Sequence, residues 1–451
     1  CAAEYLQKRD RPRAVRCRAG ANGDDSWKEG TKVKTENMKI RENRPEEGGS
    51  DRICALIHLD RIEQNMKEIA AGLPEGTAVI GVVKADGYGH GAAETAAAIE
   101  PYVSGYAVAT ADEALELRKS GVSLPVLVLG SVRDSRFREL LAADVRPVIF
   151  EEETAEAFSK LAGEAGIRGS VHLAVDAGMS RIGLKPSEES LEMIDRISSL
   201  PGLFIEGLFT HFPRADEEDK AVTKRQFEDF RNFAAQVSEL LTKKEQGRKK
   251  LICHCMNSAG IIDSHRMPEG MEMDAVRAGI CIYGLYPSGE VDRNRIRLLP
   301  AMELKSYITY IKEIEPGTAV SYGGTFVARR PMRVATVCAG YGDGYPRGLS
   351  GRGEVLIRGK RAKILGRICM DQFMADVTEI PEAEKWDTVT LVGRDGKEEI
   401  TMEELAAQCG GFHYEIPCLI GKRVPRIYVG DDKKAEAALD RGGPAEEKRE
   451  D

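Results

Sequence analysis

The segment VVKADGYGHG places Lys84 directly after a short apolar run and ahead of several glycines. A lysine amine at the end of a strand can bond covalently to a carbonyl group, and nearby glycines let backbone and ligand approach closely. A solvent-exposed lysine that merely ends a strand would look the same. The position of Lys84 alone therefore leaves both interpretations open.

Two later segments supply a hydroxyl and backbone amides of the kind that bind phosphate. They are Asn257-Ser258 and Arg277-Ala278-Gly279-Ile280, each at the end of an apolar run. In barrels of the (β/α)₈ type the phosphate site commonly lies beyond the last two strands. Because Asn-Ser pairs and glycines also form ordinary turns, the weight of this signal comes from its coincidence with Lys84.

His211, in LFTHFPRAD, and Arg181, in VDAGMSRIGL, each follow another apolar run. The imidazole of His211 can pack against an aromatic cofactor ring. The guanidinium of Arg181 can bind a carboxylate or a phenolate through its fork of donors. A structural histidine and a surface ion pair are the ordinary alternatives, so neither residue decides the function by itself.

The elements that would position these side chains begin at about residue 53. Short β-rich apolar runs alternate there with amphipathic or charged segments, which is typical of parallel strands joined by crossover helices. Eight such runs in roughly 240 residues predict a (β/α)₈ TIM-type barrel, with its chemistry at the end of each run. The runs are Ala78–Val83, Gly105–Ala109, Val126–Leu129, Arg146–Phe150, Val171–Val175, Ile205–Thr210, Ile252–Met256 and Ala275–Ile280.

Past Pro300 the sequence changes to alternating strands with glycine-rich turns, which predicts a mainly β C-terminal domain. One helix is expected over Met402–Gln408. The expected strands are Met302–Ile311, Arg333–Ala339, Glu354–Ile357, Ala362–Ile368 and Thr388–Val392.

The chain is thus expected to have two domains between two tails. Residues 1–50 lack periodic apolar positions and are expected to be a disordered tail, and 431–451 a charged tail. The barrel is expected over 51–296 and the β domain over 297–430. Since the first residue is Cys1 and no signal-peptide core follows it, translation is expected to start at Met38.

Composition excludes several classes of function. The 73 acidic residues outnumber the 65 basic ones, so no positive field gathers nucleic acid or anionic lipid. The apolar runs are far shorter than the ~18 residues of a membrane span. The ten cysteines show no disulfide spacing, which favours a cytoplasmic protein. Adjacent strand residues point to opposite faces, so we expect no metal site at Cys253-His254-Cys255.

The motifs taken together resemble those of the alanine racemases, a family of enzymes that use pyridoxal 5'-phosphate. The resemblance runs from about residue 53 to 428 and rests on segments that occur in order along the chain. The lysine segment and the SYG and ICMDQ segments are the most specific of them. The segments are VVKADGYGHG, GMSRIG, THF, NSAG, VRAGICIYG, VSYGGTF, GYGDGYPR and GRICMDQ.

The resemblance implies a two-base interconversion of L-alanine and D-alanine. Lys84 would hold the cofactor covalently, and Tyr322, from the β domain of a partner subunit, would be the opposing base. The active unit would then be a homodimer with shared active sites. D-Alanine is a precursor of cell-wall peptidoglycan, and the sequence leaves a biosynthetic and a catabolic role equally open.

The resemblance also assigns roles to the other motif residues. Arg277 would face the pyridine nitrogen and disfavour its protonation, His211 would lie against the ring, and Arg181 would bind substrate. Residues of the partner subunit would complete the substrate pocket and its entrance, namely Tyr341, Met370 and Asp371. The remaining cofactor-binding residues would be Tyr88, Asn257, Ser258, Gly279, Ile280 and Tyr414.

One position departs from the family pattern. Ala174 stands where the family usually has a lysine, often carbamylated, that orients the arginine after it. We expect a bound anion such as chloride, or water with a different carboxylate, to fill the gap between Ala174 and Arg181.

Three alternatives remain. A serine or broad-specificity racemase would share this fold, although the bulky Tyr341 and Tyr414 near the methyl pocket favour alanine. A basic amino-acid decarboxylase would carry a different cysteine-acid motif where this chain has GRICMDQ. A cofactor-binding homeostasis protein would be the barrel alone, without the β domain that contains Tyr322.

Overall fold

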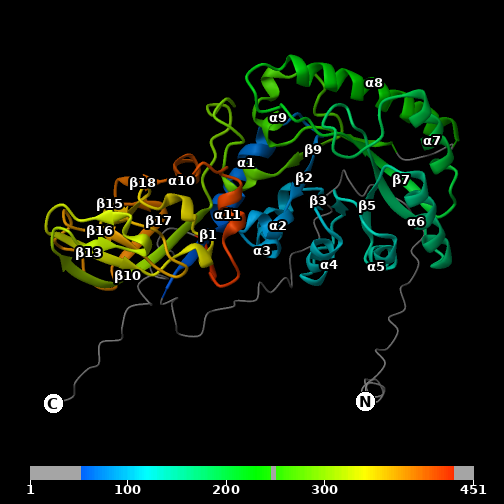
Figure 1. The fold of residues 1–451 in the computed structure, drawn as a ribbon. Helices are drawn as coiled ribbons and strands as arrows, with labels where there is room; N and C mark the ends of the chain where they lie inside the picture. Colours follow the sequence, from blue (N-terminus) through cyan, green and yellow to red (C-terminus); the bar gives the residue numbers. More distant parts are fainter. Residues whose placement is uncertain (1–51, 245–249, 431–451) are drawn as a thin grey trace, which may run out of the picture.

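The barrel predicted from the apolar runs is confirmed. A computed structural model describes residues 52–244 and 250–430 (Figure 1). Within them, strands β2 to β9 are parallel neighbours in chain order, and β9 closes the barrel on β2, with Ala275 opposite Ala78. The strands are β2 (Ala78–Val82), β3 (Gly105–Val108), β4 (Val126–Val128), β5 (Val145–Ile149), β6 (Gly169–Ala174), β7 (Leu203–Phe209), β8 (Ile252–His254) and β9 (Ala275–Ala278).

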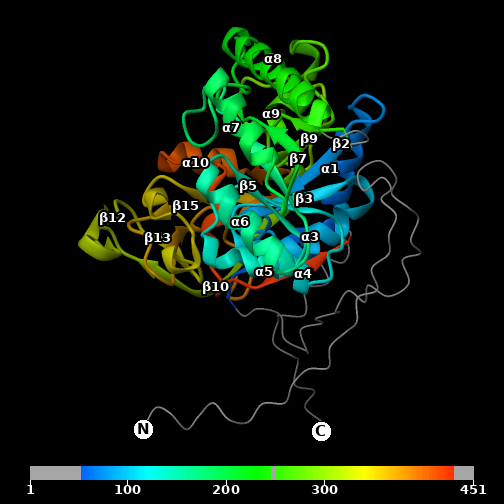
Figure 2. The ribbon, with the colours of Figure 1, turned by 90° about the vertical axis from the view of Figure 1, so that its right-hand side faces the viewer.

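Helices cover the outside of the barrel, as Figures 1 and 2 show for α4 to α8. Their apolar positions recur every three or four residues, so that one face packs on the strands. In α8 the buried residues include Phe227, Phe230, Phe233, Val237 and Leu241. The helices of the barrel part include α1 (Leu59–Ala71), α3 (Ala92–Ile99), α4 (Ala111–Lys119), α5 (Phe137–Ala142), α6 (Glu152–Glu164), α7 (Glu188–Ser198) and α8 (Ala221–Lys244).

The second domain is mainly β, as predicted. Its sheet has the strand order β18-β17-β14-β15-β16-β13-β10-β1-β19, and β17 also pairs with β10, which closes part of the sheet into a ring. A separate small hairpin pairs β11 (Ala319–Val320) with β12 (Phe326–Val327). The sheet strands after the barrel are β10 (Met302–Ile314), β13 (Met332–Val337), β14 (Glu354–Ile357), β15 (Lys360–Leu365), β16 (Phe373–Asp376), β17 (Thr388–Asp395), β18 (Glu398–Ile400) and β19 (Arg426–Val429).

The first strand of the described residues belongs to this sheet and was not predicted. Strand β1 (Cys54–His58) lies in the range expected for the barrel, 51–296, yet it pairs antiparallel with β10 and parallel with β19. Its five residues are all buried, so it reads as one more apolar run. The described part of the chain therefore begins in the sheet, builds the barrel, and returns to the sheet.

The two parts share one core. A single cluster of buried apolar side chains includes Ile80 and Leu208 of the barrel together with Ile308 and Phe373 of the sheet. Two short helices, α10 (Met402–Cys409) and α11 (Glu415–Leu419), lie between β18 and β19 in sequence. In residues 52–244 and 250–430 no helix is long and apolar enough to cross a membrane. The predicted tails, 1–50 and 431–451, and Met38 lie outside the described residues.

Candidate active site

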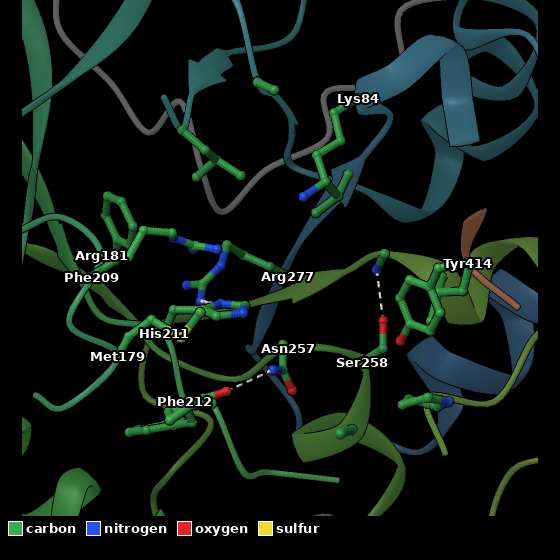
Figure 3. Close-up of a pocket in the computed structure, with 18 of the residues that line it drawn as sticks. Lys84, Met179, Arg181, Phe209, His211, Phe212, Asn257, Ser258, Arg277 and Tyr414 are labelled. Atoms are coloured by element: carbon green, nitrogen blue, oxygen red, sulfur yellow. Dashed lines mark hydrogen bonds between the residues drawn. The ribbon is translucent and has the colours of Figure 1, made fainter. Parts of the chain in front are cut away.

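A cavity of about 540 Å³ lies at the carboxyl ends of the barrel strands, which is where active sites of such barrels are found. Figure 3 shows the Lys84 side chain extending into it, with Ser258 and Tyr414 on one side and Arg181 and Arg277 on another. Ten residues singled out from the sequence line this cavity, namely Lys84, Tyr88, Arg181, His211, Asn257, Ser258, Arg277, Gly279, Ile280 and Tyr414.

Lys84 is the first residue of α2 (Lys84–Tyr88), a left-handed turn. The φ angles are +53° at Ala85, +53° at Asp86 and +51° at Tyr88, a conformation that costs a residue other than glycine about 1–2 kcal/mol. Such strain persists only where the surroundings enforce it. Gly89, at φ +79°, must be glycine because a Cβ there would overlap the carbonyl of Pro417 in α11. Packing against α11 thus helps to hold the turn that carries Lys84.

The surroundings of Lys84 favour its neutral amine. Burial lowers the pKa of Lys84, and the positive charge of Arg181 lowers it further, whereas the carboxylate of Glu113 opposes the shift. The amine also lies 5.8 Å from the ring centre of Tyr88. Because only the neutral amine attacks a carbonyl carbon or accepts a proton, burial and the charge of Arg181 activate Lys84 for both roles.

A small polar cradle lies at the ends of β8 and β9. The amide of Gly279 donates to Ser258 Oγ at 3.0 Å (Figure 3), and the side chain of Asn257 accepts from the amide of Gly260 at 3.1 Å. A Cβ at Gly279 would lie 3.2 Å from the hydroxyl of Tyr88 and 3.5 Å from Ser258 Oγ, so any side chain would fill the cradle. Hydroxyls and amides around a glycine suit a phosphate group.

Arg277, on β9, is fully enclosed. Its Nη1 donates to His254 Nδ1 at 2.7 Å, and its Nη2 donates to the carbonyl oxygen of Thr210 at 2.7 Å. Among the residues that the structure describes, no carboxylate contacts it. Burial therefore lowers the pKa of Arg277 to about 10, which still leaves it charged near neutral pH. The guanidinium also lies 5.4 Å from the ring centre of Phe209.

A series of close polar contacts runs from Arg277 through the barrel interior to Glu206. His254 Nε2 lies 2.9 Å from His172 Nδ1, and His172 Nε2 lies 3.4 Å from Glu206 Oε2, which Arg146 also contacts at 3.1 Å. Since a guanidinium only donates, His254 Nδ1 must accept, and each imidazole then donates from Nε2 toward Glu206. These contacts thus point in one direction, from Arg277 toward Glu206.

The pKa shifts of His254 and Glu206 support these donor and acceptor roles. Burial, with the charge of Arg277 nearby, moves the pKa of His254 well below its usual value. Burial alone would raise the pKa of Glu206, but the hydrogen bond from His172 and the charge of Arg146 hold it at about 2. Glu206 is therefore ionised, and its charge faces Arg277 across two imidazole rings.

His211, which follows β7, is also a neutral imidazole. Burial lowers its pKa to about 3, and the charges of Arg277 and Arg181 add to the effect. Its Nδ1 accepts a hydrogen bond from Arg277 Nη2 at 3.3 Å. The ring orientation of His211 in the cavity is therefore fixed by Arg277.

Arg181 lies beside Phe209 in the cavity (Figure 3), near the site of the family departure. Within the described part of the chain it makes no hydrogen bond and no ion pair. Ala174 is buried at the end of β6 and packs with Val148 and Phe209. The surroundings of Ala174 thus offer Arg181 an apolar wall in place of a carboxylate partner.

Four predicted residues lie away from this cavity, on the second domain. Tyr322 is 70% exposed, Met370 51% and Tyr341 42%, and Asp371 forms an ion pair with Arg423 at 2.7 Å. The amide of Tyr341 donates to the carbonyl of Cys369, so Tyr341 and Met370 are neighbours. One chain therefore does not bring Tyr322 and Lys84 together.

Two residues near the cavity were not predicted from the sequence. Phe412 lines the cavity and stacks on Tyr414 with ring centres 4.6 Å apart. Glu113 lies in α4, and its carboxylate accepts from the amide of Ala85. The spacing Thr110-x-x-Glu113 is that of a capping box, and this sequence pattern could have singled out Glu113.

The fold and the cavity define a barrel enzyme with a partly buried lysine at the end of its first barrel strand, joined to a β domain. Residues 57–287 match the family model "Alanine racemase, N-terminal domain", and residues 301–428 match "Alanine racemase, C-terminal domain". The chain belongs to the alanine racemase family and is an amino-acid racemase, an isomerase.

Relatives and solved structures agree with this membership. The alanine racemase of Desulforamulus reducens is 42% identical over 379 residues, covering 84% of this chain and 99% of the relative. The alanine racemase structure of Clostridium difficile 630 has a TM-score of 0.78 at 38% identity, covering 84% of this chain and 96% of that one. A cycloserine complex of the same enzyme has a TM-score of 0.77 at 36% identity, with the same coverage.

Proposed function

We propose that this racemase interconverts L-alanine and D-alanine with pyridoxal 5'-phosphate, and that Lys84 and Tyr322 act as opposed bases. The observation that carries the proposal is a partly buried lysine of lowered pKa in the same cavity as a cradle for phosphate. The relative from Clostridium difficile binds cycloserine, a small cyclic amino-acid analogue, which supports an amino-acid substrate here.

The described residues fit this cofactor. The cradle around Gly279, with the hydroxyls of Tyr88 and Ser258, suits the phosphate, and Asn257, Ile280 and Tyr414 would enclose it. Arg277 would face the pyridine nitrogen, and His211 would lie against the ring. When bound, the cofactor supplies an electron sink that makes the Cα proton of the substrate more acidic.

The protein residues would then manage protons and orientation. Lys84 Nζ, with its lowered pKa, can accept a proton from one face of Cα and return it. Arg277 remains charged and only donates, so it would keep the pyridine nitrogen unprotonated and discourage side reactions. Arg181 would bind the substrate carboxylate or the phenolate oxygen of the cofactor.

We propose that the second base comes from a partner subunit. Tyr322, Tyr341 and Met370 are large exposed side chains on the second domain of a chain whose own cavity they do not line. A homodimer that inserts them into the partner's cavity would cover their surface and complete both sites. Asp371, held by Arg423, would lie at the entrance.

The gap beside Ala174 supports a bound anion as an additional ligand. Arg181 has no partner among residues 52–244 and 250–430, and Ala174 leaves an apolar wall beside it. A chloride ion would supply the negative charge that orients the guanidinium.

A chiral assay tests the proposed function. Full-length protein with pyridoxal 5'-phosphate is offered L-alanine and L-serine separately, in chloride and in a salt of a bulkier inert anion. We expect rapid D-alanine, little D-serine, no product from Lys84→Ala, and weaker activity without chloride. Faster D-serine would identify a serine or broad-specificity racemase. Activity that does not depend on the anion would contradict only the proposed anion site beside Ala174.

A further inference from the structure

Glu113, on α4, joins two strand ends beside Lys84 through one carboxylate. Its Oε1 accepts from the amide of Ala85 at 2.7 Å, and its Oε2 accepts from the amide of Ala109 at 2.7 Å. Ala85 directly follows Lys84, and Ala109 follows β3 and lines the cavity. Since β2 and β3 are neighbours in the barrel, this carboxylate spans the ends of both strands at the cavity.

These contacts exceed what capping of α4 requires. The capping box needs only the bond from the Glu113 amide to Thr110 Oγ1, at 3.3 Å, and the bond from the Thr110 amide to Glu113 Oε2, at 3.1 Å. The two shorter bonds go to Ala85 and Ala109, outside the helix. Bonds from amides to an ionised carboxylate are about twice as strong as neutral ones.

The left-handed turn depends on an acceptor from outside for its first amide. Within the turn, the amide of Gly87 donates to Val83, that of Gly89 to Ala85, and that of Gly91 to Asp86. None of these bonds uses the amide of Ala85, which is the first residue of positive φ after Lys84. Glu113 therefore fixes the point at which the turn begins.

The charge of Glu113 also reaches the amine. Burial, Arg181 and Arg277 lower the pKa of Lys84, whereas Glu113 and, more weakly, Cys418 raise it. Glu113 is thus the carboxylate that offsets the two arginines at Lys84. This electrostatic contribution accompanies the bond to Ala85 and comes from the same atoms.

We propose that Glu113 is a positioning residue for Lys84, whose carboxylate ties the amide of Ala85 to the end of β3 and so holds the turn that carries the amine. The inference rests on the proposed function, in which Lys84 bonds to pyridoxal 5'-phosphate. Glu113 itself touches neither substrate nor cofactor in this assignment. Its effect is on where Lys84 points and on when it is protonated.

The test is labelling of Lys84 in the full-length protein. Pyridoxal 5'-phosphate is added over a range of pH, borohydride fixes the product, and peptide mass mapping locates it. In Glu113→Gln an NH₂ group replaces one carboxylate oxygen. That nitrogen cannot accept the hydrogen bond that the oxygen accepted from a backbone amide. We expect labelling of Lys84 to slow about tenfold, as for loss of a bond to a charged group. The pH midpoint of labelling should also move lower, because a negative charge is removed.

Two further variants separate positioning from helix stability. Thr110→Ala removes the cap of the same helix but leaves the carboxylate on Ala85, and it should label within about twofold of wild type at an unchanged midpoint. Glu113→Asp keeps the charge but is too short to span both strand ends, so it should label slowly at the wild-type midpoint. This variant carries the test if Glu113→Gln does not fold.

The possible failures are distinguishable. Glu113→Gln that labels at the rate and midpoint of Thr110→Ala would overturn the role of Glu113 and leave the proposed function intact. Wild-type protein that is not labelled at Lys84 would overturn the proposed function and this inference with it.

Discussion

At the scale of single residues, the side chains of the site fall into two groups, those that follow strands and those that contact them from inside other strands. Lys84 and Ser258 each stand at the end of an apolar run, so their meeting at one end of the barrel could be predicted. Glu206 and His172 lie inside strands and looked like ordinary barrel residues. Their contact with the Arg277 system exists only because β6, β7 and β8 are neighbours in the closed barrel.

Glu206 should affect cofactor binding although it lies two imidazoles from Arg277. Glu206→Gln removes the charge that the series of polar contacts carries toward Arg277. We expect pyridoxal 5'-phosphate to bind about tenfold more weakly, ~1.4 kcal/mol, in a fluorescence titration. The free energy of unfolding should fall by about 3 kcal/mol, which is the low end for a broken buried ion pair. The cost is at the low end because Arg146 keeps its second ion pair, with Asp144 at 2.8 Å.

Glu303 offers a matched control for that variant. Burial would raise its pKa, but contacts with His58 and Lys305 hold it at about 2, much as for Glu206. It lies on β10 in the large sheet, outside the cavity. Glu303→Gln should therefore cost stability and leave cofactor affinity unchanged. Equal loss of affinity in the two variants would refute a specific role for Glu206.

At the scale of elements, the barrel strands were predictable and the turn after the first of them was not. Parallel barrel strands are covered on both faces, so they read as continuous apolar runs with sharp ends. The turn after Lys84 places Ala85, Asp86 and Tyr88 at positive φ, against their own preference. Only tertiary contacts with α4 and α11 enforce that conformation, and no local sequence pattern predicts those contacts.

Two glycine substitutions separate the cost of the contact between this turn and α11 from the cost of backbone strain. Gly89, at φ +79°, abuts Pro417, whereas Gly76, at φ +83°, has open space around it. Gly76→Ala should lower the free energy of unfolding by about 1–2 kcal/mol, the strain of the backbone alone. Gly89→Ala should cost about 1–3 kcal/mol more, from the added overlap, and should impair labelling of Lys84. Denaturant titrations of both variants measure the difference. Equal costs would mean that α11 does not restrain the turn.

At the scale of the whole molecule, the first and last strands of the described residues tie the two parts together. Strand β1 pairs with β10 and β19, and one apolar core runs through both parts. The sequence did not reveal this because the run at Cys54–His58 has no feature that distinguishes it from a barrel strand. The orientation of the β domain on the barrel is thereby fixed, and with it the face that presents Tyr322.

Whether that face completes a neighbouring site can be measured by mixing two inactive variants. Lys84→Ala and Tyr322→Phe should each lose nearly all activity alone. If sites are shared, a mixed dimer has one cavity with both native residues and one with neither. Random re-pairing makes half of the dimers mixed, so activity should recover to about a quarter of wild type. No recovery, with mixed dimers verified by mass, would mean that Tyr322 serves its own chain and that the exposed face has another use.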